Sequence, residues 1–179
     1  ALNRQHPLGT LVADLHTATG ERRQVQLADG STLVLNARSA VDVEYSASMR
    51  LLRLRKGEIL IHTAPDPARP LVVQTLHGQA RALGTRFSVR QLDTHSELAV
   101  LEHRVQLTAT SGAQQVLDAG STARFDGTRI QPLAASAATH AAWAGGQLDV
   151  RDQPLGEVVN ALRPYKRGYG FGPRTLGFP

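Results

Sequence analysis

The sequence predicts a mainly β fold in which antiparallel sheets stack on one another, as a sandwich or roll of solenoid-like character. Three observations predict it. From about Thr10 to Gln131, short segments of alternating apolar and polar residues are separated by turn signals about every 8 to 12 residues. The apolar residues of each segment fall on one face, as in strands that bury one side. Aromatic residues make up only 4% of the chain, so Leu, Val and Ala must fill most of the core.

The first predicted hairpin lies in residues 25–35. Val25 and Leu27 alternate with polar neighbours before Asp29-Gly30, and the alternation resumes in residues 33–35. The Asp-Gly pair tolerates the positive φ that a type I′ turn needs at both central positions, and the twist of that turn matches the twist of strands. We therefore expect a tight turn at this pair.

The same scheme recurs further along the chain. Each instance has two alternating segments around a central pair of turn residues, so each predicts another hairpin. The central pairs are Lys56-Gly57 (between Leu52, Leu54 and Ile59, Ile61), Glu102-His103 (between Leu98, Val100 and Val105, Leu107) and Asp126-Gly127. Three prolines, Pro65, Pro67 and Pro70, mark an exposed connection, because proline removes a donor from the strand ladder.

The composition changes after residue 132, which divides the chain into three parts. Residues 1–132 form the all-β domain, and the alanine-rich residues 133–146 are a linker or a short helix. Residues 147–179 begin with a predicted strand, continue with a helix that Asp152 caps and Pro164 ends, and finish as a flexible Gly- and Pro-rich tail.

The predicted strand and helix of residues 147–164 each carry apolar residues that a unit of this size is unable to bury alone. The helical residues follow a stripe spaced i, i+3, i+4 and i+7. We expect the unit to dock on the β domain, on a continuation of the chain or on a partner, although burial of an ordinary helix face is the simpler reading. The candidate partner-binding residues are Leu148, Val150, Leu155, Val158, Val159 and Leu162.

Bulk composition excludes several classes of function. Without cysteine there is no disulfide framework and no thiolate nucleophile, and no apolar run reaches the roughly 18 residues of a membrane helix. The net charge of +5 comes from arginines spread along the chain, with few aromatic residues for base stacking, so we expect no nucleic-acid partner. The seven histidines have no metal-ligand spacing, and no phosphate-binding or dinucleotide-binding motif is present, so we expect no metal and no cofactor.

One motif suggests covalent chemistry, in residues 82–89 (ALGTRFSV). Gly84 easily adopts a positive φ and allows a sharp bend, and the hydroxyl of Thr85 follows within reach of the Gly84 carbonyl. Attack by that hydroxyl would move the acyl group from nitrogen to oxygen and leave an ester that water hydrolyses readily. The alternative is a plain tight turn into the strand of residues 86–89. His77 is one candidate for the base.

Other motifs follow in order over about residues 10–165. They are TGERR at 19–23, LADGS at 27–31, LNA at 35–37, KGE at 56–58, PARPLVV at 67–73, VLEHRV at 100–105, Ala119-Gly120 and Trp143. Together with residues 82–87, they resemble the periplasmic sensor part of FecR-type anti-sigma factor regulators. The sequence departs from that pattern at Leu71, where an aromatic residue is usual, and at His103, where glycine is usual.

The resemblance implies a function in cell-surface signalling for siderophore and iron uptake. The domain would lie in the periplasm as part of a membrane-anchored protein and bind the signalling domain of a TonB-dependent outer-membrane transducer. An ECF sigma factor would bind only a cytoplasmic segment that this sequence lacks. Residues 147–179 would be a partial secretin/TonB short N-terminal module, a small α/β remnant, followed by a tail in which Gly170 to Pro179 depart from the family's pattern. The family's self-cleavage at a Gly-Thr bond would place the scissile bond between Gly84 and Thr85, as a single-turnover autoproteolysis. The alternative function is a cupin-like or glycan-active β-fold enzyme that uses dispersed histidines and acidic residues.

Overall fold

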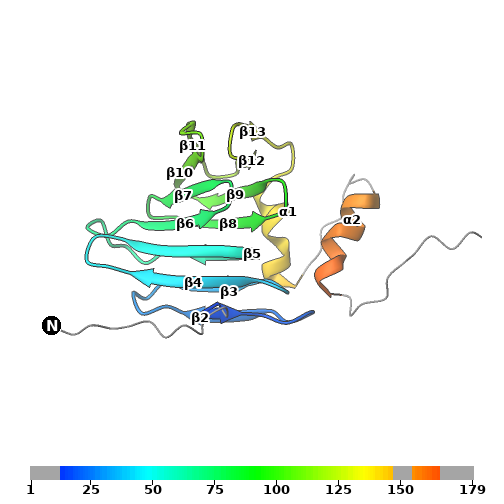
Figure 1. The fold of residues 1–179 in the computed structure, drawn as a ribbon, viewed down its shortest axis with the longest axis horizontal. Helices are drawn as coiled ribbons and strands as arrows, with labels where there is room; N and C mark the ends of the chain where they lie inside the picture. The colour runs from blue at the N-terminus through cyan, green and yellow to red at the C-terminus, as the bar shows by residue number, and fades with distance from the viewer. Residues whose placement is uncertain (1–12, 147–154, 166–179) are drawn as a thin grey trace, which may run out of the picture.

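The computed structural model describes residues 13–146 and 155–165, in which the chain is mainly β, as the sequence predicts (Figure 1). The strands are β1 Leu15–His16, β2 Arg23–Gln26, β3 Thr32–Leu35, β4 Ala40–Tyr45, β5 Arg50–His62, β6 Leu71–Thr75, β7 Gly78–Ala82, β8 Arg86–Gln91, β9 Ser96–Glu102, β10 Arg104–Ala109, β11 Gln114–Asp118, β12 Thr122–Phe125 and β13 Ile130–Pro132. The helical elements are α1 Ala137–Ala141, η1 Ala142–Gly145, α2 Leu155–Leu162 and η2 Arg163–Tyr165. Each helix in this part of the chain is far shorter than one that crosses a lipid bilayer.

The strands form two sheets that share the long strand β5. The first sheet contains β1, β4, the first half of β5, β6, β7, β10 and β11. The second contains β2, β3, the second half of β5, β8, β9, β12 and β13. The described pairs are antiparallel apart from β5 with β6. That pair is parallel because the chain leaves the first sheet along β5 and returns to it through the proline-containing residues 63–70 to begin β6.

A single apolar core draws on both sheets. Leu52 and Val73 enter it from the first sheet, and Ile61 and Phe87 enter it from the second, all four with no exposed surface. Full burial of one such side chain stabilises the fold by roughly 1.5–3 kcal/mol. The two sheets therefore pack on one another through this shared core, with few aromatic residues in it.

Apart from the connection of residues 63–70, the described chain passes between the two sheets at corners where one residue has a positive φ. Such a conformation costs a residue with a Cβ about 1–2 kcal/mol, which explains why glycine occupies most of these positions. The corner residues are Gly20, Arg38, Gly57, Gly84, His103 and Gly120.

The hairpin predicted at Lys56-Gly57 is wrong, because β5 runs without interruption through this pair. Gly57, with φ +87°, is instead the corner at which β5 leaves the first sheet for the second. The residues of β5 that enter the core change from even positions (Leu52, Leu54) to odd positions (Ile59, Ile61) across it. One extra residue at a bend shifts the alternation as a turn would, so the sequence pattern is the same for both.

The hairpin predicted at Glu102-His103 is also wrong, because these residues form a corner between the two sheets. Strand β9 pairs with β8 and β12 in the second sheet, whereas β10 pairs with β7 and β11 in the first. His103, at φ +56°, adopts the left-handed conformation that a glycine would adopt more easily. The hairpin predicted at Asp126-Gly127 is confirmed as the turn between β12 and β13.

The hairpin around Asp29-Gly30 is confirmed as β2 with β3, but the expected type I′ turn is wrong. Gly30 has φ +87°, whereas Asp29 has no positive φ. The Gly30 N–H donates to the Leu27 carbonyl at 3.0 Å and the Leu27 N–H donates to the Ser31 carbonyl at 2.8 Å, as in a three-residue loop with a left-handed glycine. The Asp29 carboxylate accepts the Ser31 N–H at 3.1 Å, which favours this wider turn.

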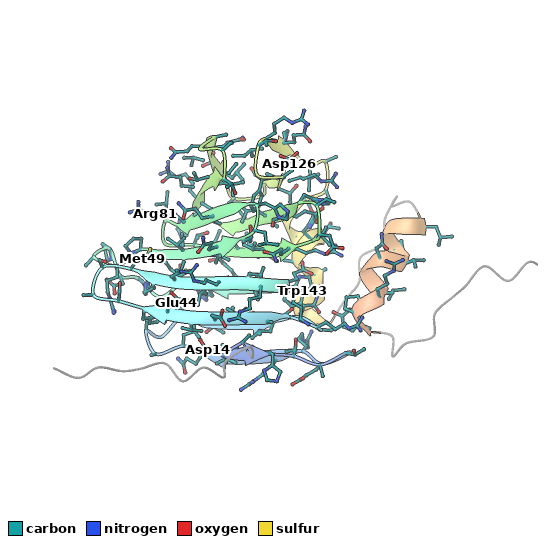
Figure 2. The ribbon with its side chains drawn as sticks, in the orientation of Figure 1. Asp14, Glu44, Met49, Arg81, Asp126 and Trp143 are labelled. Carbon is teal, nitrogen blue, oxygen red and sulfur yellow. The ribbon has the colours of Figure 1, made fainter. Side chains whose placement is uncertain are left out.

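The alanine-rich segment after β13 folds as α1 and η1. The Ser136 hydroxyl caps α1 by accepting the Thr139 N–H at 3.2 Å. Ala141 and Trp143 pack against Leu60, which points away from the core because its neighbours in β5 point into it. The segment therefore covers the outer face of the second sheet, and Trp143 lies at the end of the sheets nearest α2 (Figure 2).

Candidate functional site

The Gly84–Thr85 peptide bond lies at the corner between β7 and β8. Gly84 is exposed with φ +72°, and a Cβ added to it would meet no atom within 4 Å. Thr85, in contrast, is only 2% exposed. Water therefore reaches Gly84, the residue on the acyl side of the bond, whereas Thr85 on the nitrogen side is buried.

Thr85 is held through its main chain and its side chain. Its N–H donates to Thr63 Oγ1 at 2.9 Å, and its carbonyl accepts the Thr63 N–H at 3.1 Å and the Thr63 hydroxyl at 2.7 Å. The Thr85 hydroxyl donates to the Glu102 carbonyl, with the Arg86 carbonyl 3.4 Å away. An attack by this hydroxyl on the Gly84 carbonyl would first require its hydrogen bond to the Glu102 carbonyl to break.

His77, the candidate base, lies in the turn between β6 and β7. Its Nδ1 atom is 2.9 Å from Ser96 Oγ on β9. The hydrogen bonds of Thr85 within the described residues go to Thr63, Arg86 and Glu102, so they do not include His77. Within residues 13–146 and 155–165, no three or more His, Asp or Glu side chains form a group that could hold a metal ion.

The four residues of the predicted apolar stripe, Leu155 to Leu162, all lie in α2. Leu155 is 78% exposed, Val159 49% and Leu162 37%, and Val158 is partly buried. Exposed large apolar residues gathered on one helix face are informative because folded chains usually bury them. The other two candidate partner-binding residues, Leu148 and Val150, and the proposed cap Asp152 lie outside the described residues.

The end of the α2–η2 unit contacts the β domain, and α2 itself lies off the ends of the strands (Figure 1). The Gly20 N–H donates to the Pro164 carbonyl at 3.0 Å, and the Tyr165 hydroxyl donates to Asn36 Oδ1. Burial and the nearby carboxylate of Glu58 raise the pKa of Tyr165. These contacts hold the unit at η2 and leave the apolar stripe of α2 uncovered.

A row of alternating charges crosses the outer face of the second sheet. Glu58, Arg90, Glu97 and Arg124 come from β5, β8, β9 and β12 and lie directly opposite one another in the strand register. Glu97 Oε2 is 4.0 Å from Arg90 Nη1, and Glu97 Oε1 is 3.7 Å from Arg124 Nη2. Burial raises the pKa of Glu58 to about 7, against the opposing charge of Arg90. Sequence reasoning missed this row, because its members come from four separate strands.

The Asn36 amide joins this row to the contact with η2. Asn36 Nδ2 donates to Glu58 Oε2 at 3.0 Å, and Asn36 Oδ1 accepts from both the Ala37 N–H and the Tyr165 hydroxyl. Asn36 belongs to a motif that resembles the family, but the sequence contains no signal that it bridges two parts of the chain.

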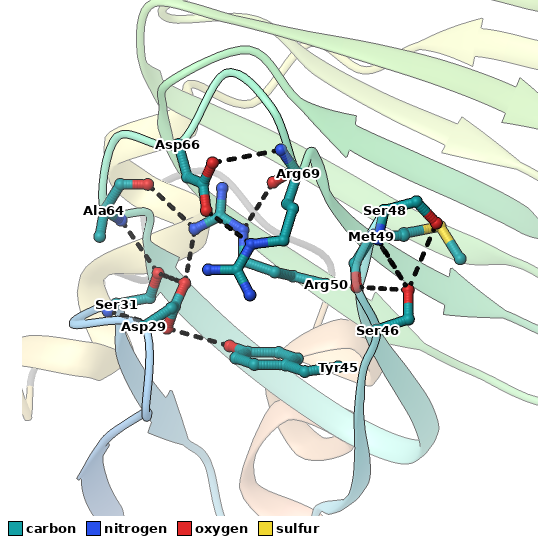
Figure 3. Close-up of polar contacts among 10 residues, drawn as sticks. All are labelled: Asp29, Ser31, Tyr45, Ser46, Ser48, Met49, Arg50, Ala64, Asp66 and Arg69. Atoms are coloured by element: carbon teal, nitrogen blue, oxygen red, sulfur yellow. Dashed lines mark hydrogen bonds and ion pairs between the residues drawn. The ribbon is translucent and has the colours of Figure 1, made fainter.

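A buried ion pair between Arg50 and Asp29 lies at the start of β5 (Figure 3). Its two side chains are 4% and 2% exposed, and Arg50 Nη1 is 2.5 Å from Asp29 Oδ2. Arg50 also donates to the carbonyls of Ala64 (3.0 Å) and Arg69 (2.7 Å). Burial acts to raise the pKa of Asp29, but hydrogen bonds from Ser31 and Arg50 hold it below its ordinary value. The pair ties the first hairpin and the proline-containing connection to the start of β5.

Comparison with known proteins places the chain in a family. The family model described as FecR protein matches residues 13–106, more than half of the 179 residues. Two crystal structures of a "putative anti-sigma factor" from Parabacteroides distasonis ATCC 8503 superpose with TM-scores of 0.75 and 0.74. Each is 24% identical, and each match covers 84% of this chain and 73% of the other, so the likeness shows a shared fold. No curated protein matches the sequence.

Proposed function

This chain belongs to the FecR protein family, and from that premise we propose that it is the signal-receiving domain of a membrane-anchored anti-sigma factor regulator. In this proposal the domain lies in the periplasm, receives a signal from another protein and relays it to an anti-sigma segment tethered in the inner membrane. The ECF sigma factor binds that separate cytoplasmic segment. The β domain is the scaffold that holds the receiving surface.

The observation that carries the proposal is the exposed apolar stripe of α2. Leu155 and Val159 face solvent at 78% and 49% exposure, although burial of each side chain would contribute roughly 1.5–3 kcal/mol. A partner with a complementary apolar groove would gain that free energy by accepting the helix face, a common mode of recognition between proteins. The contacts of η2 with Gly20 and Asn36 support this use, because they attach α2 without covering the stripe.

The proposed partner is the signalling domain of a TonB-dependent outer-membrane transducer for siderophores. The support is the resemblance of the sequence from about Gln147 to Leu162 to part of a secretin/TonB short N-terminal module, from whose pattern the sequence of residues 170–179 departs. We propose that residues 147–179 comprise a partial module of this kind and a Gly- and Pro-rich tail, after a β domain of residues 1–132 and a connecting segment of residues 133–146. Leu148 and Val150 would then extend the binding surface beyond the described residues.

Titration calorimetry tests this proposal against the signalling domain of a transducer encoded beside this protein. We expect 1:1 binding by the wild type and at least about tenfold weaker binding by Val159→Asp, because the new carboxylate would have to be desolvated in an apolar groove. Val116→Asp is the matched control, because Val116 on β11 is 51% exposed, close to the 49% of Val159.

The controls separate two ways of failing. Equal weakening by Val159→Asp and Val116→Asp would show that the α2 stripe has no specific role in binding. The partner would still be supported. No binding to the signalling domain of any neighbouring transducer would count against the partner itself.

A second proposed activity is self-cleavage between Gly84 and Thr85. The position of the bond favours it, since Gly84 is exposed in a left-handed conformation while Thr85 is fixed by Thr63. The Thr85 Oγ1–Gly84 carbon bond forms, the carbon–nitrogen bond breaks, and the hydroxyl proton passes to the nitrogen. Water then hydrolyses the ester, giving the Gly84 carboxylate and restoring the Thr85 hydroxyl.

Intact-mass measurement of the purified chain tests this activity. Cleavage gives fragments 1–84 and 85–179, and Thr85→Val, which keeps the shape of the side chain but lacks the nucleophile, stays whole. A single full-length mass after long incubation of the wild type would defeat the proposal.

A further inference from the structure

Thr63 occupies an unusual position in the strand ladder beside the Gly84–Thr85 bond. It follows the last residue of β5, and it lies opposite Thr85 because His62 pairs with Arg86. In a regular antiparallel pair, a main-chain carbonyl accepts the N–H of the opposite residue. Here the side-chain hydroxyl of Thr63 accepts the Thr85 N–H at 2.9 Å. A hydroxyl therefore lies directly against the nitrogen of the bond in question.

The chemical difference between a hydroxyl and a carbonyl matters at this atom. A carbonyl only accepts hydrogen bonds, whereas a hydroxyl both accepts and donates. The Thr63 hydroxyl already does both, because it accepts the Thr85 N–H and donates to the Thr85 carbonyl at 2.7 Å. It remains well placed when the nitrogen changes from a hydrogen-bond donor to a proton acceptor.

The nitrogen makes that change during an acyl shift. As the Thr85 hydroxyl adds to the Gly84 carbonyl, the nitrogen loses its amide conjugation and gains a free electron pair. It must then take up a proton before the carbon–nitrogen bond breaks, since an uncharged amine leaves far more readily than an amide anion. A donor within hydrogen-bond distance of the nitrogen assists such a step.

We propose that Thr63 is a catalytic residue of the cleavage between Gly84 and Thr85, a role that rests on the self-cleavage proposed above. Its hydroxyl orients the peptide through the nitrogen and donates a proton to that nitrogen as the carbon–nitrogen bond breaks. The proton that Thr85 Oγ1 releases restores the Thr63 hydroxyl. The protons balance, and water for the final ester hydrolysis is the only other reactant.

Variants of Thr63 separate this role from a purely structural one. Thr63→Ser keeps the hydroxyl, Thr63→Val keeps the shape without it, and Thr63→Ala replaces the valine variant if the latter fails to fold. Thr75→Val is the matched control. Thr75 is buried to a similar degree, at 8% against 7% exposed, and its hydroxyl likewise accepts a main-chain N–H, that of His77, and donates to a main-chain carbonyl, that of Gly78.

The rate of appearance of fragment 85–179 is measured by intact mass, with and without hydroxylamine, at a temperature where circular dichroism shows each variant folded. Hydroxylamine attacks an ester faster than water does, so the rate in its presence reports the acyl shift itself. We expect Thr63→Ser and Thr75→Val to cleave within about threefold of the wild type, and Thr63→Val to be slower by about 100-fold, the usual range for loss of a proton donor.

Each other result has a definite meaning. Wild-type cleavage rates in folded Thr63→Val and Thr63→Ala would overturn the role of Thr63 and leave self-cleavage intact. Equal slowing by Thr63→Val and Thr75→Val would overturn it too, because general loosening of the turns would then explain the effect. Failure of the wild type to cleave would overturn self-cleavage and this role together.

Discussion

The Arg50 guanidinium contacts three separated parts of the chain, as Figure 3 shows. It reaches the carboxylate of Asp29 and the carbonyls of Ala64 and Arg69, with only 4% of its side chain exposed. A motif search picks out Asp29-Gly30-Ser31 as a turn, but gives no sign of the buried cation opposite it. The burial of that charge depends on tertiary packing, which local pattern does not encode.

Replacement of Arg50 by Met tests this arrangement. We expect the free energy of unfolding in urea to fall by about 3–5 kcal/mol, because the Asp29 carboxylate would be left buried without its cation. The same replacement at Arg53, whose ion pair with Glu44 is about half exposed, should cost no more than about 1 kcal/mol. Similar losses in the two variants would contradict the role given to the buried pair.

Glu58 links the stability of the protein to pH. Burial raises the pKa of Glu58 to about 7, so the folded state holds a proton that the unfolded chain loses near its ordinary pKa of about 4.3. The stability that this group contributes is complete below that ordinary pKa. It is lost as the pH rises to about 7, with a total on the order of 3 kcal/mol.

Glu58→Gln removes this titration while it keeps the shape and the hydrogen-bonding capacity of the side chain. Urea unfolding between pH 4.5 and 7.5 should show a smaller decline of stability with rising pH in this variant than in the wild type. Glu102→Gln, at a side chain that is 48% exposed, should leave the wild-type slope unchanged. A wild-type slope in Glu58→Gln would show that Glu58 does not carry the effect.

Among the glycine corners between the two sheets, Gly57 is the one at which an added Cβ would meet its neighbours most closely. A Cβ on this residue would lie 2.3 Å from Ser39 Oγ and 2.6 Å from Ser39 Cα, and its φ is +87°. Both the close approach and the backbone conformation oppose any other residue. The hydroxyl of Ser39 also accepts the Glu58 N–H and donates to the Glu58 carbonyl, so the corner and β5 are held together.

Gly57→Ala should therefore destabilise the protein more than an alanine at a corner with free space. Gly120, with φ +90° and no atom within 4 Å of an added Cβ, is the matched position. We expect Gly120→Ala to cost about 1–2 kcal/mol from its backbone conformation alone. Gly57→Ala adds the steric clash and should cost at least about 1 kcal/mol more, as for an overpacked core. Equal losses measured by urea unfolding would exclude the clash.

The strands themselves were predictable, whereas the way they connect was not. Alternation over Leu33, Leu35 and their neighbours identifies a strand because a period of two depends only on local residues. A one-residue shift of that alternation has two causes, a hairpin or a corner between sheets, and residues 56–57 and 102–103 turned out to be corners. Which one occurs depends on long-range pairing, such as β10 with β7, that no local pattern contains.

The candidate residues were predictable to the extent that they lie in one short segment. The Gly84-Thr85 motif and the α2 stripe were found because their residues are neighbours in the sequence. Thr63, in contrast, is brought to Thr85 by the pairing of β5 with β8, and its 22-residue separation has no counterpart in sequence pattern. The charged row under α1 was missed for the same reason.

At the scale of the whole molecule, the two sheets form a fixed scaffold and the α2–η2 unit is attached at its edge. The core joins both sheets, and the contacts of Pro164 with Gly20 and of Tyr165 with Asn36 hold the unit beside the ends of the strands. Loss of a buried core residue should lower stability, and loss of a stripe residue should lower binding alone. In the proposed signal-receiving domain, the core would therefore determine stability and the α2 stripe would determine binding.

Hydrogen–deuterium exchange of this chain, alone and with the proposed partner, a transducer signalling domain, tests that central claim most directly. The account predicts that complex formation slows amide exchange in residues 155–162, while exchange in the buried strands β5 and β8 stays as slow as in the free chain. Slowed exchange confined to the strands, or none in residues 155–162 of a complex shown by calorimetry to form, would contradict it.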